Sequence, residues 1–231
     1  MNKNKLQEEI GYRFNNEKLI EQALTHSSYT REKNLPRAEC NERLEFLGDA
    51  FFDAIIGEEL YNRLPTKKEG YLTKYRALVV CEASLAQVGR KLEIGELLKL
   101  GKGENQSGGR NRESVIADAM EAIIGAIYKD GGYETVRELV LKLFDQRIDD
   151  AVSGRLHSDY KSEFQERMQS KGPAEIQYVL MDEQGPDHAK IFYIKVLVDD
   201  VAYGEGTGHS KKEAEQQAAK EAILNWGKYV L

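Results

Sequence analysis

Hydrophobic and polar positions follow two different periods along the chain. Up to residue 148, apolar residues recur every three or four positions, which is the spacing of amphipathic α-helices. Beyond Pro173 the spacing becomes two, as in Phe192, Ile194, Val196 and Val198, which is the pattern of half-buried β-strands. The pattern therefore predicts an all-α segment followed by a small α+β segment.

The first segment is predicted to contain a series of helices. They are expected over residues 6–14, 17–24, 42–64, 66–88, 114–128 and 134–148. Pro65 ends the third helix, because proline lacks the N–H that a helix interior requires. The glycine-rich stretch 101–112 is expected to be a mobile loop, in which Lys102, Arg110 and Arg112 contact either a phosphate backbone or only solvent.

The second segment is predicted to have the order helix, three strands, helix. Its helices are expected at 159–170 and 211–226, and its strands at 176–180, 192–198 and 201–208. Helical periodicity lapses around residues 149–155, which indicates a linker. The expected organisation is an all-α domain over residues 1–150, a linker over 151–157, and an αβββα domain over 158–231.

One predicted helix carries an acidic stripe. Glu42, Glu45 and Asp49 lie at i, i+3 and i+7, so their carboxylates share one face, and no lysine interrupts that face. Like charges at this spacing repel one another, so such a stripe is unfavourable without a bound cation. The alternative is an ordinary solvent-exposed acidic face, and this helix alone does not decide between them.

A second helix changes that balance. Residues 114–128 are almost entirely apolar or small, and Asp118 and Glu121 are their only charges, again at i and i+3. Two carboxylates on an apolar helix require a cation or a proton, because an unpaired buried charge is costly. Oxygen ligands without a nearby His or Cys favour Mg²⁺ or Mn²⁺ over zinc. If the two helices pack together, Glu45, Asp49, Asp118 and Glu121 form one cluster.

Composition limits the class of protein. The 231 residues are 41% hydrophobic and 31% charged, without an apolar run long enough to span a membrane, and the N-terminus lacks the apolar centre of a secretory signal. We therefore expect a cytoplasmic protein with reduced cysteines at Cys40 and Cys81. The net charge of −6 argues against a general nucleic-acid binder, so any RNA contact must come from local basic clusters.

Three stretches carry a resemblance to a known family. Residues 41–50, Asn-Glu-Arg-Leu-Glu-Phe-Leu-Gly-Asp-Ala, resemble the signature of ribonuclease III, and the helix of Asp118 and Glu121 resembles its second acidic motif. Residues 206–215, Gly-Thr-Gly-His-Ser-Lys-Lys-Glu-Ala-Glu, resemble the most recognisable part of a double-stranded RNA-binding domain. The similarity extends over almost the whole chain.

The resemblance implies an Mg²⁺-dependent endoribonuclease specific for double-stranded RNA, in which Mn²⁺ can replace Mg²⁺. The implied products have 5′-phosphate and 3′-hydroxyl ends and short 3′ overhangs, and the implied role is in rRNA and mRNA processing. Glu45, Asp49, Asp118 and Glu121 would be the metal ligands, with Asp49 and Glu121 catalytic. The alternatives are a catalytically inactive RNA-binding protein of the same fold, or a metal phosphohydrolase acting on small molecules.

The resemblance also assigns residues to binding. Its expected RNA contacts are Glu42, Glu69, Gln165, His188, Lys211 and Lys212. Phe46 corresponds to the residue that the family inserts into a partner subunit, which implies a homodimer; an ordinary core aromatic is the alternative. A membrane and a small-molecule organic cofactor are not expected as partners.

Three further residues deserve mention: Asp53, Glu215 and His26. Asp53 departs from the family pattern and either extends the acidic stripe or faces solvent. Glu215 stands where many members carry a basic residue, which predicts weaker RNA binding by this domain. His26, among hydroxyl residues, is expected to be a hydrogen-bonded packing residue.

Overall fold

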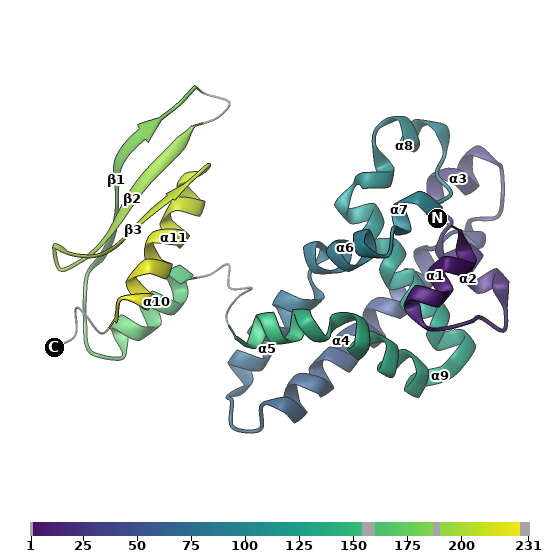
Figure 1. Cartoon of the computed structure of the whole chain (residues 1–231), viewed down its shortest axis with the longest axis horizontal. Helices are drawn as coiled ribbons and strands as arrows, with labels where there is room; N and C mark the ends of the chain where they lie inside the picture. The colour runs from purple at the N-terminus through teal and green to yellow at the C-terminus, as the bar shows by residue number, and fades with distance from the viewer. Residues whose placement is uncertain (1, 154–159, 187–189, 227–231) are drawn as a thin grey trace. The chain divides into compact units, whose positions relative to one another are not determined.

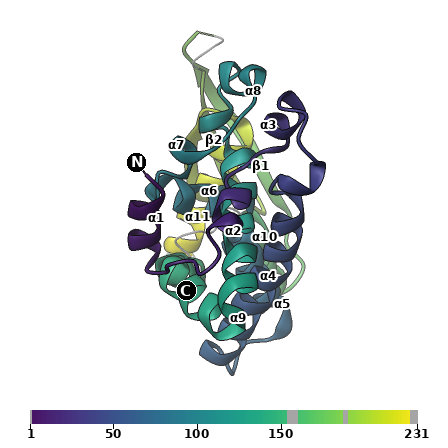
Figure 2. The ribbon, with the colours of Figure 1, turned by 90° about the vertical axis from the view of Figure 1, so that its right-hand side faces the viewer.

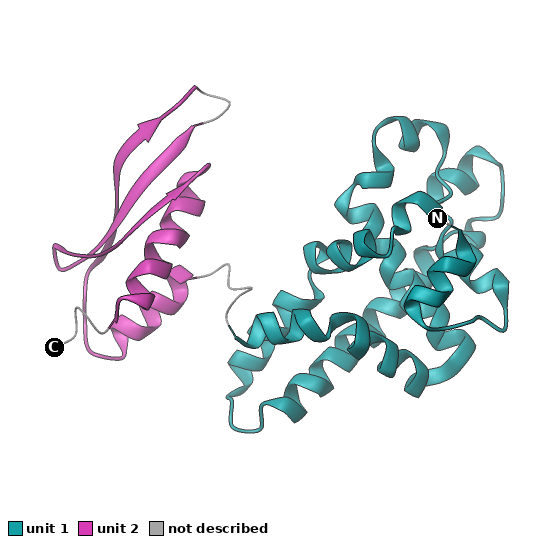
Figure 3. Cartoon of the chain, viewed as in Figure 1, with its two compact units in different colours: residues 1–156 teal, residues 157–231 magenta. Residues whose placement is uncertain are grey.

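Two compact units make up the chain, over residues 1–156 and 157–231 (Figure 3). The computed structural model describes residues 2–153, 160–186 and 190–226. The first unit is helical, and the second combines three strands with two helices. The predicted fold classes of the two segments are thus confirmed.

The helices of the first unit are labelled in Figure 1. They are α1 Lys3–Ile10, α2 Glu17–Ala23, α3 Ser27–Glu32, α4 Glu42–Arg63, α5 Glu69–Val80, α6 Glu82–Lys91, α7 Ile94–Leu97, α8 Lys102–Gln106 and α9 Glu113–Val152, with 3₁₀ turns η1 Arg37–Glu39 and η2 Gly109–Asn111. The expected helix over 66–88 is divided at Cys81 into α5 and α6. Helix α9 unites the two helices expected at 114–128 and 134–148, with a break at Gly132, where φ is +80°.

Helices α4 and α9 lie side by side at the centre of this unit, in both views (Figures 1 and 2). Two glycines make the close approach possible. A Cβ atom on Gly48 would lie 1.8 Å from the carbonyl oxygen of Glu121, and one on Gly125 would lie 2.2 Å from that of Leu44. Further along, the rings of Phe52 and Phe144 pack with their centroids 4.6 Å apart. The backbones of α4 and α9 are therefore in direct contact next to Glu45 and Glu121.

The glycine-rich stretch 101–112 is folded, in contrast to the expected mobile loop. It contains α8 and η2, and Arg110 ties it to the neighbouring chain: Nη1 donates to the carbonyl of Gly95 at 2.8 Å and Nε to Asn105 at 2.7 Å. Arg112 donates to the carboxylate of Glu104. These intrachain bonds use both guanidinium groups for structure, which the sequence pattern did not reveal.

The N-terminal segment is anchored at the break in α9. The side chain of Asp130 accepts hydrogen bonds from the hydroxyl of Tyr12 at 2.8 Å, the backbone N–H of Asn15 at 2.7 Å and that of Asn16 at 3.0 Å. A single carboxylate thereby satisfies three donors from the turn between α1 and α2. This turn and the centre of α9 are held together.

The second unit is a three-stranded antiparallel sheet with two helices. The strands β1 Ile176–Gln184, β2 Ile191–Val198 and β3 Val201–Gly208 lie in the order β1-β2-β3, and the helices are α10 Tyr160–Gln169 and α11 Lys211–Leu224. Ile194, Val196 and Val198 of β2 are buried with Phe164 of α10 and the alanines of α11. The period-two pattern of β2 therefore marks its helix-facing side, as predicted.

Candidate active site

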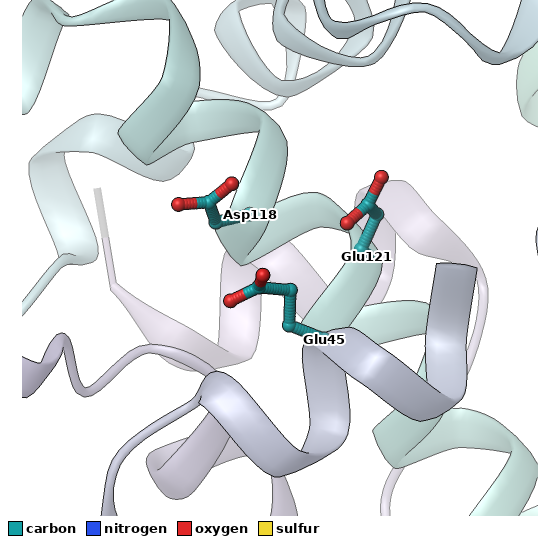
Figure 4. Close-up of side chains that lie close together, drawn as sticks. All are labelled: Glu45, Asp118 and Glu121. Atoms are coloured by element: carbon teal, nitrogen blue, oxygen red, sulfur yellow. The ribbon is translucent and has the colours of Figure 1, made fainter. Parts of the chain in front are cut away.

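Three carboxylates from α4 and α9 converge. Oxygen atoms of Glu45, Asp118 and Glu121 all lie within 4.8 Å of one another, and the three side chains are half-buried. Figure 4 shows Glu45 reaching from α4 toward the two side chains of α9. Residues more than 70 positions apart in the sequence thus form one acidic group.

The convergence follows from the contact between the two helices. Gly48 packs on the carbonyl of Glu121, and Glu45 precedes Gly48 by three residues, which is close to one turn of helix. On the other side of the same contact, Gly125 of α9 packs on the carbonyl of Leu44, which is the residue before Glu45. The close approach of the two backbones therefore brings Glu45 next to the part of α9 that carries Glu121.

Burial and mutual repulsion raise the pKa of two of these groups. The pKa of Glu45 is raised from 4.5 to about 7, mainly by burial and then by the charges of Asp118, Glu42 and Asp49. The pKa of Glu121 is raised from 4.5 to about 8, mainly by burial and then by Asp49 and the other acidic neighbours. Without a cation, the site therefore holds protons at neutral pH.

Within the described residues, no Lys or Arg forms an ion pair with Glu45, Asp118 or Glu121. Half-buried carboxylates without a basic partner are unfavourable, and a divalent cation would relieve both the burial and the repulsion. Because all the converging ligand atoms are oxygens, the donor set fits a hard ion of the Mg²⁺ or Mn²⁺ type. The site chemistry thus fits the metal expected from the sequence.

Asp49 lies at the edge of this group. Its side chain is exposed, and its carboxylate is outside the set of three that converge within 4.8 Å. Its charge nevertheless raises the pKa of both Glu45 and Glu121, so it is an electrostatic neighbour of the site. Asp53, one turn further along α4, also raises the pKa of Glu121, which favours the first of the two alternatives, an extended acidic stripe.

Glu42 and Glu69 lie outside the convergent group. The Glu42 carboxylate accepts a hydrogen bond from Nε of Arg37 at 3.0 Å, and this bond lowers its pKa. Glu69 is exposed at the start of α5 and accepts a bond from the Thr73 hydroxyl at 2.6 Å. The predicted acidic stripe therefore splits: Glu45 turns toward α9, whereas Glu42 is paired near the helix start.

Two groups near Asp118 had not been assigned to the site from the sequence. Burial raises the pKa of the Asp118 carboxyl most strongly; the charge of His26 lowers it, and that of Glu82 raises it. His26 precedes α3 and Glu82 begins α6, so neither lies on the helices with acidic patterns. Helical periodicity describes one helix at a time, so it could not show that His26 and Glu82 influence the pKa of Asp118 on another helix.

Comparison with known proteins identifies both units. Residues 16–147 match the family model described as Ribonuclease-III-like, and residues 160–225 match the model of the double-stranded RNA binding motif. The first match covers more than half of the chain. The chain belongs to the ribonuclease III family.

Individual relatives agree with this assignment. The chain is 52% identical to Ribonuclease 3 of Desulforamulus reducens over 221 residues, covering 95% of this chain and 89% of the relative. It is 48% identical to Ribonuclease 3 of Caldanaerobacter subterraneus subsp. tengcongensis over 222 residues, covering 96% and 97%. The solved nuclease domain of ribonuclease III from Campylobacter jejuni aligns with a TM-score of 0.59 at 37% identity, covering 63% of this chain and 98% of that domain.

In the second unit, the described residues that the ribonuclease III resemblance assigned to RNA contact are exposed. Gln165 lies on α10, and Lys211 and Lys212 open α11 after Ser210, whose hydroxyl caps the helix. His188 lies outside the described residues. Glu215, the departure from the ribonuclease III pattern, pairs with Lys161 at 2.7 Å, so its carboxylate has a partner within the domain.

Phe46 does not belong to the core of the unit. It follows Glu45 on α4, yet its side chain is 79% exposed. An exposed phenylalanine loses the favourable burial that a core aromatic gains, about 1.5–3 kcal/mol. The alternative that Phe46 is an ordinary core residue of this chain is therefore wrong.

Proposed function

We propose that this ribonuclease III is an endoribonuclease that hydrolyses phosphodiester bonds of double-stranded RNA, leaving 5′-phosphate and 3′-hydroxyl ends. The observation that carries the proposal is the convergence of Glu45, Asp118 and Glu121 in a chain that also contains a double-stranded RNA binding motif. An acidic site that binds a hard cation is suited to phosphodiester hydrolysis. Attack by water, without the 2′-hydroxyl, gives the stated ends.

The proposed ligands of Mg²⁺, or of Mn²⁺ in its place, are Glu45, Asp118 and Glu121, with Asp49 joining from the edge of the site. When bound, the cation would acidify a water molecule and stabilise negative charge on the scissile phosphate. The protein's own contribution is to hold these carboxylates on two rigid helices whose contact at Gly48 fixes their separation. Asp49 and Glu121 are the proposed catalytic pair, since Asp49 is the solvent-facing member and its charge acts on Glu121.

The second unit would hold the duplex. A-form RNA exposes its 2′-hydroxyls in a wide minor groove and hides its bases in a deep major groove, so recognition depends on shape. We assign Lys211 and Lys212 to the phosphates, because they open a helix whose N-terminus already favours anions. Gln165 and His188 are assigned to minor grooves, and Glu42 and Glu69 to RNA at the border of the catalytic site.

The proposed assembly is a homodimer. Each chain supplies one acidic site, whereas cutting both strands of a duplex requires two; a pair of sites along one cleft would leave short 3′ overhangs. The 79% exposed ring of Phe46 beside Glu45 is suited to insertion into a second copy. The solved Campylobacter jejuni nuclease domain is itself described as having a flexible region involved in dimer formation.

The proposed setting is rRNA and mRNA processing in the cytoplasm. Both units are those of the relatives named Ribonuclease 3, and the match covers 89% or more of the two relatives described above. Among the helices that the structure describes, none is long and apolar enough to span a membrane.

A catalytically inactive RNA-binding protein is the alternative with the same fold. It would be expected to lack acidic residues of the site, whereas Glu45, Asp49, Asp118 and Glu121 are all present. The small-molecule phosphohydrolase does not account for the RNA-binding module. Neither alternative is favoured.

Removal of divalent cations tests the proposed function. With Mg²⁺, the full chain is expected to cut a long RNA duplex into short duplexes, and to leave either separated strand intact. EDTA should abolish cutting, and Mn²⁺ added afterwards should restore it. Gel electrophoresis and end-labelling measure the products; binding of the duplex without cutting in Mg²⁺ would instead support the inactive binding protein.

The pH dependence of cation binding gives a second prediction. Because the pKa values of Glu45 and Glu121 are raised to about 7 and about 8, a cation must displace protons at neutral pH. Affinity for Mn²⁺ is therefore expected to rise between pH 6 and pH 9, by about tenfold per pH unit for each proton released. Calorimetry at pH 7 in two buffers of different ionisation enthalpy should show different heats, and equal heats would contradict the prediction.

A further inference from the structure

A polar hollow lies at the start of α4. Its volume is about 290 Å³, and its lining residues come from α3, the loop after α3, the turn η1 and the start of α4: Ser27, Thr30, Arg31, Leu35, Arg37 and Glu42. We call it the arginine hollow. Glu42 precedes Glu45 by three residues, which is nearly one turn of helix, so the hollow borders the acidic site.

The backbone and the side chain of Arg37 are both anchored. Nε2 of Gln22 on α2 donates to the carbonyl of Ala38 at 2.9 Å and to that of Cys40 at 3.1 Å. The N–H of Cys40 in turn donates to the carbonyl of Arg37 at 3.2 Å. Nε of Arg37 donates to the carboxylate of Glu42 at 3.0 Å. The turn that carries Arg37 and one edge of its guanidinium group are thus held in place.

The remaining edge of this guanidinium group is open to a ligand. The Arg37 side chain is 86% exposed, and its Nη1 and Nη2 atoms donate no hydrogen bond within the part of the chain that the structure describes. Arg31 is also exposed and, among the described residues, forms no ion pair with a carboxylate. The lining of the hollow therefore contains two guanidinium groups and one carboxylate, that of Glu42, which leaves it positively charged.

A positive hollow at this place meets a requirement of the proposed reaction. The acidic site repels the RNA backbone that has to approach it, so basic groups at its border are needed. Arg110 and Arg112, which were expected from the sequence to contact phosphate, are bonded within the chain instead. A planar guanidinium group binds two phosphate oxygens at once, which makes arginine well suited to an RNA backbone.

We propose that the arginine hollow binds a backbone phosphate of the RNA duplex beside the cleavage site. Arg31 and Arg37 are the phosphate ligands, and Glu42 is a positioning residue that holds Nε of Arg37 and leaves Nη1 and Nη2 to the phosphate. The inference rests on the proposed function and names a binding site within it. It also explains how a carboxylate at the border of the site can favour RNA binding, although its own charge repels phosphate.

The test is Arg37→Gln, and separately Arg31→Gln, in the full chain. In EDTA, we expect the dissociation constant for a long RNA duplex to rise by about tenfold in each variant, because a charge-assisted hydrogen bond is lost. Between 50 and 200 mM salt, the wild type should lose about threefold more affinity than either variant, because it makes one more phosphate contact. In Mg²⁺, KM should rise while kcat stays near that of the wild type.

The matched control is Arg13→Gln, which removes the same charge from an exposed arginine of the first unit that does not line the hollow. Its affinity and salt dependence should equal those of the wild type. All three arginines are exposed, so the melting temperatures of the variants should stay close to that of the wild type. Duplex affinity of Arg37→Gln and Arg31→Gln equal to that of Arg13→Gln would overturn the proposal.

A double-mutant cycle tests the role of Glu42. If Glu42 acts through Arg37, Glu42→Gln should weaken duplex binding in the wild type but have little further effect in Arg37→Gln. Additive effects would assign Glu42 a separate RNA contact and overturn its positioning role.

Two further results separate the sources of phosphate and the two proposals. If inorganic phosphate raises the melting temperature of the wild type but not of Arg37→Gln, while RNA affinity is the same in both, the hollow is a site for a free anion and the RNA assignment is wrong. If the wild type binds duplex RNA but does not cut it in Mg²⁺, the proposed function fails, whereas the duplex-binding measurements still decide whether the hollow binds phosphate.

Discussion

Glu121→Gln is expected to reduce cleavage of duplex RNA by about 10³-fold. Glu121 is one of the three converging carboxylates, and glutamine keeps its shape while removing the charge that would hold a cation. A bound cation contributes several kcal/mol to stabilising transition-state charge, and about 1.4 kcal/mol corresponds to a factor of ten in rate. Single-turnover cleavage in Mg²⁺ measures the loss, and duplex binding without cleavage should be retained.

The matched control is Glu138→Gln, on the same helix α9 but exposed to solvent. It should cleave at the wild-type rate. Without cations at pH 9, Glu121→Gln should melt at a higher temperature than the wild type, because the fold loses stability as pH rises from 4.5 through the raised Glu121 pKa of about 8. Wild-type cleavage by Glu121→Gln would exclude this carboxylate from the proposed mechanism.

Gly48→Ala is expected to destabilise the first unit by more than about 3 kcal/mol, at or beyond the upper end for overpacked cores. The new Cβ would lie 1.8 Å from a backbone carbonyl oxygen, and neither α4 nor α9 can yield without separating. Any folded fraction should bind Mn²⁺ poorly, because separation moves Glu45 from Asp118 and Glu121. Denaturant unfolding followed by circular dichroism, together with Mn²⁺ titration, measures both effects.

Gly57→Ala is the control for helix propensity. It lies on the same helix α4, but its Cβ would meet only the Arg76 side chain at 3.8 Å, an ordinary van der Waals contact. Alanine is favoured over glycine inside a helix by about 0.5–1 kcal/mol, so this variant should be neutral or slightly stabilised. A Gly48→Ala protein as stable as Gly57→Ala would show that the helix contact is not required.

The sequence predicted the two acidic helices because their charges stand out against apolar surroundings. Asp118 and Glu121 are the only charges in residues 114–128, and a three-residue interval places both on one face. The choice among the carboxylates of α4 could not be predicted, because periodicity gives a face but not the angle at which another helix crosses it. In the structure, Glu45 converges with Asp118 and Glu121, whereas Asp49 is exposed.

The sequence also did not reveal how residues in short connecting segments influence the acidic site. Glu42 is paired with Arg37, which lies in the turn before α4. His26 and Glu82, at the starts of α3 and α6, act electrostatically on the pKa of Asp118. The stretch 101–112 looked mobile because of its glycines, whereas the bonds of Arg110 to Gly95 and Asn105 fold it. Long-range side-chain bonds of this kind override local composition, which is the only signal available in the sequence.

In the second unit, alternation predicted the buried face of β2 correctly, because one side of the sheet is covered by helices and the other is not. Leu180, at the end of the strand predicted over 176–180, is 39% exposed. The register of β1 against β2 shifts between Leu180 and Asp182, which turns the following residues. The alternation of apolar and polar residues within one strand does not show where its register against the neighbouring strand shifts.

The attachment to Asp130 makes the turn of Tyr12, Asn15 and Asn16 part of the cooperative unit that contains α9. Opening of the turn after α1 would break the bonds of Tyr12, Asn15 and Asn16 to Asp130, on the helix that carries Asp118 and Glu121, so a truncation that removes this turn is not a neutral change. Opening of the turn between α1 and α2 and local unfolding at the centre of α9 are therefore expected to occur together.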